Sequence, residues 1–187
     1  HLKYRQAFKT NFISQFSFPD SLGLENRESE SMNPYGHLTG DYESYFRLGK
    51  KVSLNLEFSM GISNNDKPFT DNFYVGGYGY NLRESQVAFV GLHSHELLQG
   101  NYVKEKVALE YRPLPNLYLS ALFNFLFVGD DFTTFIDEFL SFSDEGRYMG
   151  AGAGFTYKSP LGPLSIYLGS RTDIWNPIWY INLGFTF

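Results

Sequence analysis

"WYINLGFTF" (residues 179–187) closes the chain, and every second side chain of this segment is large and apolar. The alternating apolar residues are Trp179, Ile181, Leu183, Phe185 and Phe187. Because successive side chains of a β-strand point to opposite faces, this pattern predicts a strand with one apolar face. Such a face covers either the core of a soluble sheet or the lipid-facing wall of a membrane barrel.

The same period of two recurs along the chain, whereas helical periodicity is scarce. It predicts eight strands, at residues 4–18, 36–48, 52–63, 102–112, 117–128, 147–158, 163–170 and 178–187. Most of these segments are longer than the roughly five or six residues that are usual for strands of soluble proteins.

The connections between the predicted strands alternate between short and long. The short ones are 49–51, 113–116 and 159–162, and the long ones are 19–35, 64–101, 129–146 and the less extended 171–177. Transmembrane barrels have short turns on one rim and long loops on the other, and a soluble sandwich has no reason to sort its loops. We therefore expect an all-β fold, an antiparallel transmembrane β-barrel with eight strands in this chain. A soluble lipocalin-like barrel or sandwich is the alternative.

Composition narrows the function. Phe, Tyr and Trp make up 19% of the chain and gather at the ends of the predicted strands, as the interfacial girdles of barrels do. The absence of cysteine excludes disulfides, zinc–thiolate sites and a Cys nucleophile. The net charge of −5, with no cluster of Lys or Arg, argues against a nucleic-acid partner. Gly150, Gly152 and Gly154 form one row on a polar face and leave room inside a barrel for other groups.

Three segments carry a family resemblance: "FYVGGYGYNLRES" (73–85), "SPLGPLSIYLGS" (159–170) and the terminal nonapeptide. Together they resemble the BamA-type surface-antigen superfamily, whose barrels lie in the outer membrane of Gram-negative bacteria. The stretch "FVGLHSHELLQGNYVKEKVALEYRPLPNLYL" (89–119) is most similar to the barrels of patatin-like phospholipases. The chain has no G-x-S-x-G nucleophile elbow, so the resemblance implies a catalytic domain upstream and no enzyme activity or cofactor in this chain.

The resemblance also implies particular site residues. In the family, a Gly-Gly stretch in the largest inserted loop leads to an Arg followed by Gly and an aromatic residue. Here Gly76 and Gly77 lead to Arg83, one residue later than usual, and Glu84 and Ser85 follow. Arg83 is then expected to contact the inside of the barrel, with Asp130 or Asp131 as partner, and an exposed loop Arg is the alternative.

The family's barrels have sixteen strands, and this chain supplies eight. We expect one barrel domain or barrel half over 1–187, with the long inserted loop at 64–101. It forms an eight-stranded barrel, the C-terminal half of a larger one, or one partner of a paired assembly. The closing strand is expected to pair with the first strand and to be recognised by the barrel-assembly machinery. The expected function is to embed and anchor, and to export or assemble, an upstream domain in outer-membrane lipid.

Two loops offer other chemistry. His93 and His95 share a face if their segment is extended, and with Glu96 they suggest a metal-binding surface protein or a self-sufficient barrel enzyme. No third ligand follows from the spacing, and no metal is expected. The stretch from Asp130 to Asp144 has near-helical apolar spacing and predicts a short amphipathic lid or surface helix.

Overall fold

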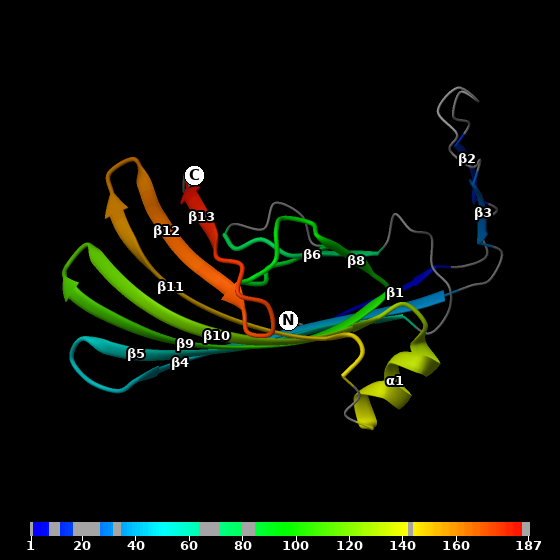
Figure 1. Ribbon diagram of the computed structural model, residues 1–187, viewed down its shortest axis with the longest axis horizontal. Coiled ribbons are helices and arrows are strands. Elements are labelled where there is room, and N and C mark those ends of the chain that lie inside the picture. Colours follow the sequence, from blue (N-terminus) through cyan, green and yellow to red (C-terminus); the bar gives the residue numbers. More distant parts are fainter. Residues whose placement is uncertain are drawn as a thin grey trace.

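The protein, a computed structural model, is built on one antiparallel sheet of eight strands in the order β1-β4-β5-β9-β10-β11-β12-β13 (Figure 1). The structure describes residues 2–7, 12–16, 27–31, 35–63, 72–79, 85–141 and 144–184. The strands of this sheet are β1 (Leu2–Ala7), β4 (Tyr35–Arg47), β5 (Val52–Ser63), β9 (Asn101–Leu114), β10 (Leu117–Gly129), β11 (Arg147–Ser159), β12 (Gly162–Arg171) and β13 (Ile178–Leu183). The predicted all-β antiparallel fold is confirmed.

The prediction of one strand over 4–18 is wrong. Of the described residues in this part of the chain, only Leu2–Ala7 joins the large sheet, where Leu2 pairs with Gly40 and Ala7 pairs with Tyr35. The described register between β1 and β4 ends at the pair of Ala7 with Tyr35, the first residue of β4. The chain pairs again further on, where β2 (Phe12–Phe16) and β3 (Arg27–Ser31) form a separate antiparallel pair.

Short and long connections alternate as predicted. Tight turns join β4 to β5, β9 to β10 and β11 to β12, and these three turns gather at one end of the sheet (Figure 1). The longer connections include helix α1 (Phe132–Leu140) and an inserted segment, residues 72–99, with three short strands. These strands are β6 (Phe73–Val75), β7 (Gln86–Val87) and β8 (Leu97–Gln99), which form their own sheet in the order β7-β6-β8.

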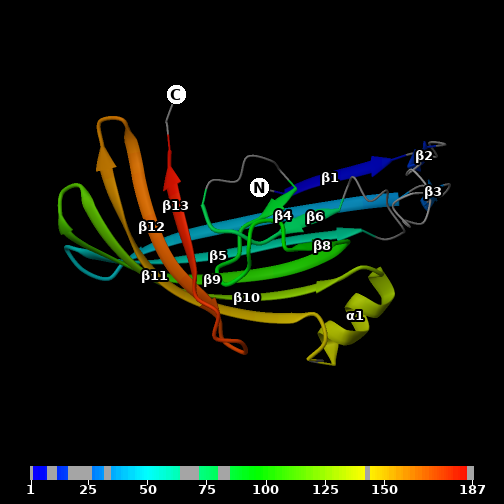
Figure 2. The same cartoon turned by 45° about the horizontal axis from the view of Figure 1, so that its top comes forward.

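The large sheet is curved, and the inserted segment lies against its concave face (Figures 1 and 2). The contact forms the largest apolar cluster, in which side chains of the segment pack against Tyr102, Leu126 and Val128 of β9 and β10. The buried residues that the segment contributes are Phe73, Val75, Val87, Phe89 and Leu92. The concave side of the sheet is therefore filled by the chain itself.

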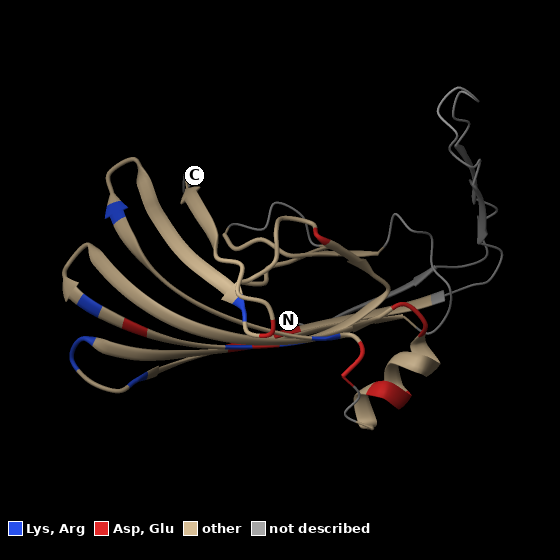
Figure 3. Ribbon diagram, in the orientation of Figure 1, with Lys and Arg blue, Asp and Glu red and all other residues tan. Residues whose placement is uncertain are grey.

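The convex face of the sheet carries large apolar side chains, which alternate along each strand with the side chains of the concave face. Leu109 and Phe123 are 46% and 43% exposed, although their strands are long and central, and Ile181 of the edge strand β13 is 69% exposed. On the concave face, polar Asn124 and Lys104 are only 2% and 4% exposed. β10 and β13 contain no charged residue, and Figure 3 shows charges confined to short stretches of the other strands. A soluble barrel would bury the apolar set instead, so this alternative does not fit the structure.

The two edges of the sheet are β1 and β13. The expectation that the closing strand pairs with the first is not met among the described strands, where the two lie at opposite edges. β13 ends at Leu183 and pairs with β12 alone in the described part of the chain. No helix in the described ranges combines the length and hydrophobicity needed to span a membrane.

Candidate functional site: the polar concave face and its inserted segment

A row of glycines on β11 and β12 makes room for the inserted segment. A Cβ on Gly150 would collide with the backbone carbonyl of Val90, and one on Gly152 would lie 2.8 Å from Cγ1 of Val90. Gly169 of β12 faces the same Val90 side chain. The prediction that the row accommodates other groups is thus confirmed for Gly150 and Gly152, whereas Gly154 lies against Tyr167 of the neighbouring strand.

Gly76 and Gly77 form the crossing point of the inserted segment. Both have positive φ, 119° and 78°, which a residue with a Cβ rarely adopts. The Gly76 N–H donates to Val87 at 3.0 Å, and the Gly77 N–H donates to Leu92 at 3.0 Å. A Cβ at Gly76 would also meet the carbonyl of His93. The glycine pair therefore lets its own stretch of the segment pack closely against the stretches around Val87 and Leu92.

Two polar side chains of β13 bind the inserted segment to the sheet through hydrogen bonds. The Tyr180 hydroxyl donates to the carbonyl of Leu92 at 2.9 Å and accepts from the Gly91 N–H at 2.9 Å. Asn182 donates through Nδ2 to the carbonyl of Tyr78 at 2.9 Å. The lumen side of the closing strand is thus bonded to two separate points of the inserted segment.

Replacing Tyr180 with Phe should destabilise this docking. Tyr180 is 8% exposed, so the change leaves the buried Gly91 N–H without this acceptor and removes one of the two hydrogen bonds to the Leu92 carbonyl. We expect a loss of about 1–3 kcal/mol in the free energy of unfolding, measured by urea titration in lipid vesicles. Tyr157→Phe is the control, because its side chain lies on the convex face and is 45% exposed. Equal midpoints for the two variants would contradict the assignment.

An ion network crosses the concave face between β5 and β9. Lys104 Nζ donates to Glu57 Oε1 at 2.6 Å and to the carbonyl of Ala88 in the inserted segment at 3.2 Å. Lys106 pairs with the other oxygen of the same carboxylate. Glu57 stands directly opposite Lys106 in the sheet register. One carboxylate thus binds both ammonium groups, and Lys104 links the network to the segment.

Replacing Lys104 with Met should cost more stability than replacing Lys106 with Met. Lys104 is the more deeply buried and is the lysine that reaches Ala88, so its loss removes two hydrogen bonds. We expect a loss of about 2 kcal/mol for Lys104→Met, since Lys106 still compensates Glu57. The same urea titration measures both variants. A larger loss for Lys106→Met would show that the contact to the segment contributes nothing.

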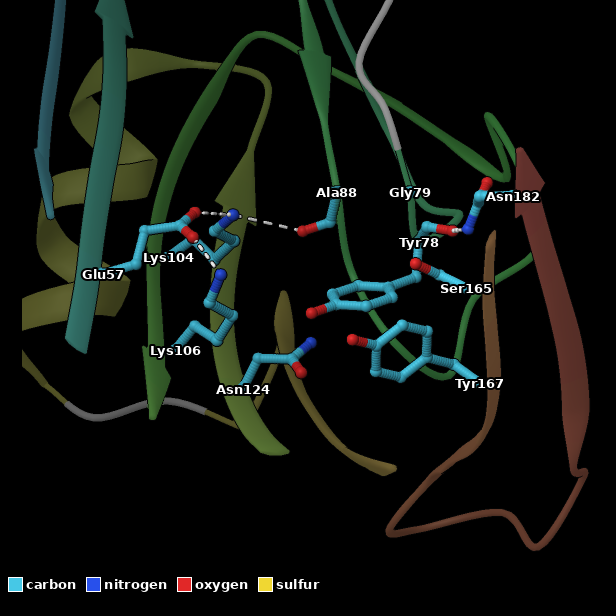
Figure 4. Close-up of a pocket in the computed structure, with 10 residues that line it drawn as sticks. All are labelled: Glu57, Tyr78, Gly79, Ala88, Lys104, Lys106, Asn124, Ser165, Tyr167 and Asn182. Atoms are coloured by element: carbon cyan, nitrogen blue, oxygen red, sulfur yellow. Dashed lines mark hydrogen bonds and ion pairs between the residues drawn. The ribbon is translucent and has the colours of Figure 1, made fainter. Parts of the chain in front are cut away.

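A polar cavity of about 250 Å³ remains between the segment and the sheet (Figure 4). Figure 4 shows the rings of Tyr78 and Tyr167 near its centre, with centroids 4.7 Å apart, and Asn124 beside them. Burial raises the pKa of Tyr78 further above physiological pH than is usual for a tyrosine, and its neutral hydroxyl can donate a hydrogen bond. Asn124 Nδ2 reaches the carbonyl of Val90 at 3.5 Å, whereas its Oδ1 has no partner within the described residues.

The residues of the metal hypothesis do not share an extended face. His93 to Glu96 form a tight turn in which His95 has φ of 58° and the Glu96 N–H donates to the His93 carbonyl. The Glu96 carboxylate accepts from the His93 N–H at 2.6 Å. The His95 ring contacts Gln86 and the edge of Tyr74. Among the described residues, no three His, Asp or Glu side chains converge as metal ligands would.

The two acidic residues proposed as partners of Arg83 have other bonds. Asp131 is the N-cap of α1, and its carboxylate accepts from the backbone N–H and the hydroxyl of Thr134. These bonds hold the pKa of Asp131 below its usual range. The Asp130 carboxylate accepts from the Gly100 N–H at 3.3 Å. Arg83 itself lies outside the described residues, so its contact to either carboxylate stays a prediction.

The apolar residues of the closing strand lie on the exposed face. Trp179, Ile181 and Leu183 are all more than half exposed. Phe185 and Phe187 lie outside the described residues. The role of these five residues as a segment recognised by assembly machinery stays a prediction.

The residues that hold the inserted segment were missing from the predicted site. Lys104, Lys106 and Glu57 stand on the polar faces of two predicted strands that are consecutive along the sheet. Opposite charges on neighbouring antiparallel strands are the signal from which this cross-strand pair could have been predicted. Tyr180 carried no such indication, because its partners are backbone groups of a distant segment.

Comparison with solved structures gives the same fold. The chain is similar to BamA from Haemophilus ducreyi lacking POTRA domains 1-3, with a TM-score of 0.54 and 16% identity over 80% of this chain and 34% of that chain. It is similar to CdiB from Acinetobacter baumannii, with a TM-score of 0.53 and 18% identity over 84% of this chain and 28% of that chain. The chain thus spans about a third of the length of these structures. A comparison with curated proteins found no match.

Comparison with family models gives one match that covers nearly the whole chain. The model of the OMP85 superfamily matches residues 9–187. This range includes the glycine pair of the inserted segment, the glycine row that receives it and the closing strand. The chain therefore belongs to the OMP85 superfamily, and its curved antiparallel sheet has the fold of the BamA and CdiB barrels.

Proposed function

We propose that the chain is part of the wall of a β-barrel in the outer membrane of a Gram-negative bacterium. The convex face meets lipid, and the concave face holds the inserted segment in the lumen. The proposal rests on how the side chains are distributed over the two faces of the sheet. Large apolar side chains point outward, and polar side chains are buried on the concave face. In water such a convex face would be a severe aggregation liability.

The size of the apolar band supports the same proposal. The outward side chains of β10 run from Leu117 to Phe127, ten residues apart, and helix α1 covers the last of them. At about 3.3 Å per residue this is about 33 Å along the strand. With the roughly 40° tilt of outer-membrane strands, the band is about 25 Å tall, which matches the apolar band of these barrels.

We also propose that the barrel embeds and anchors an upstream domain, and exports it or takes part in its assembly. The resemblance of 89–119 to the barrels of patatin-like phospholipases supports a lipase as that domain. Both edges of the sheet, β1 and β13, would then be continued by further strands, from the rest of the protein or from a second copy. The closing strand would be the segment that the barrel-assembly machinery recognises. The residues that precede His1 in the full protein test the domain: a G-x-S-x-G motif supports a lipase, and repeated small α/β modules contradict it.

Heat-modifiable migration tests the membrane barrel. After extraction of the outer-membrane fraction, the folded protein should migrate faster than the boiled protein on a detergent gel. Recovery of the protein in the soluble fraction, with one mobility before and after boiling, would overturn the proposal.

A further inference from the structure

We propose that helix α1 is a membrane-interface anchor, seated outside the barrel wall and inserting Phe139 and Leu140 into the lipid boundary. The boundary meant is the layer between acyl chains and headgroups on the side of the long loops. This inference rests on the proposed membrane barrel and adds a lipid-binding surface to it.

The helix packs on the convex face of the sheet. Phe135 is 1% exposed and its ring centroid lies 5.3 Å from that of Phe127, an outward side chain of β10. Val103 of β9 and Met60 of β5, which also point outward, belong to the same cluster. In Figures 1 and 2, α1 lies on the opposite side of the sheet from β6 and β8. The helix therefore cannot act as a lid over the concave face.

Local sequence fixes this position. Asp131 caps the first turn, so the helix begins directly after β10 ends at Gly129. A Cβ on Gly129 would lie 3.1 Å from the Phe135 ring, so glycine lets the ring approach the wall closely. Phe139 continues the contact one turn later, with its centroid 5.4 Å from Phe127. The helix is thus built against the wall along its length.

The helix leaves apolar side chains exposed where they continue the convex face. Leu140 is 69% exposed and Phe139 is 37% exposed. Phe139 contacts the buried Phe127, and Leu140 follows Ile136 by four residues, so the spacing puts it on the same side of the helix. Thr133, Thr134 and Asp137 are exposed as well and give the helix a polar side. An amphipathic helix of this kind lies in the plane of the interface with its apolar side in lipid. Because the exposed pair is continuous with a surface that meets lipid, lipid is the occupant that fits it.

The charge of the connection that contains α1 indicates which kind of lipid contact the helix makes. The connection from Gly129 to Gly146 contains six carboxylates and no Lys or Arg. Attraction to anionic headgroups therefore does not hold the helix, and the contact depends on insertion of apolar side chains. The carboxylates keep the polar side in the water layer, which limits how deeply the helix enters.

Single-cysteine spin labelling tests the proposal, because the chain has no cysteine of its own. Labels are placed at Leu140, at Thr133 on the polar side of the same helix, and at Phe123 in the middle of the convex face. The protein is folded into phosphatidylethanolamine–phosphatidylglycerol vesicles, and collision with oxygen, which concentrates in lipid, is compared with collision with a water-soluble nickel chelate. We expect the oxygen-to-nickel ratio to be several-fold higher at Leu140 than at Thr133, and highest at Phe123.

The three labels distinguish a failure of the interface anchor from a failure of the membrane barrel. A lipid-like ratio at Phe123 with equal, aqueous ratios at Leu140 and Thr133 would overturn the interface anchor and leave the membrane barrel standing. An aqueous ratio at Phe123 would overturn the membrane barrel and the anchor with it. The double variant Phe139→Ser, Leu140→Ser should in addition lower the ratio at a label on the neighbouring Ile136, and an unchanged ratio there would count against insertion.

Discussion

Replacing Phe123 with Arg is expected to lower the free energy of unfolding in lipid vesicles by about 2–4 kcal/mol. Phe123 points outward near the middle of β10 and is 43% exposed. In the proposed barrel it faces the centre of the bilayer, where a guanidinium loses its hydration. The measurement is reversible urea unfolding in vesicles, followed by tryptophan fluorescence from Trp175 and Trp179.

Tyr157→Arg is the matched control. Tyr157 is also aromatic, points outward and is 45% exposed, but it pairs with Leu117 beside the tight turns at the rim. The cost of a charge falls to about 0–1 kcal/mol near the interface, so this variant should be almost neutral. Equal costs at the two positions would mean that depth does not matter, which contradicts a lipid-facing wall.

Replacing Gly150 with Ala is expected to cost about 3 kcal/mol, at the upper end of the range for overpacking. The added Cβ would collide with the carbonyl of Val90, a backbone group that cannot rotate away. Either the inserted segment leaves its seat or β11 bends. The free energy comes from the same urea titration, and protease cleavage within 72–99 reports whether the segment is displaced.

Gly49→Ala provides the control for this second variant. Gly49 lies in the tight turn between β4 and β5, and a Cβ there would have nothing within 4 Å. It should leave both the free energy and the cleavage pattern unchanged. If Gly150→Ala were equally silent, the inserted segment would not be seated against the glycine row.

The strands of the second half follow directly from the sequence. Between 101 and 171, apolar and polar residues alternate over 10 to 14 residues per strand, and the turns contain Pro or Gly. The two faces of a barrel wall meet different surroundings, so most residues of a strand follow the alternation. The exceptions, such as Leu126, are apolar residues of the concave face that pack against the inserted segment. The end of β1 was not predictable in this way, because it depends on where its partner β4 begins.

The inserted segment shows the limit of periodicity. Its three strands have only three, two and three residues, too few for any alternation to appear. In the sequence, Gly76 and Gly77 identified the segment as a candidate site, and the glycine row at Gly150 indicated the space that receives it. Which residues join the two depended on contacts such as Tyr180 with Gly91, 89 residues apart in sequence, which no local pattern encodes.

The central claim is that one face of the sheet meets lipid and the other holds the chain's own inserted segment. A scan of single-cysteine labels along β10, from Leu119 to Leu126, tests it most directly. In vesicles, lipid contact should alternate with a period of two, high at Leu119, Ala121, Phe123 and Phe125 and low at Ser120, Leu122, Asn124 and Leu126. Aqueous exposure of the first set, or a profile without alternation, would contradict the account.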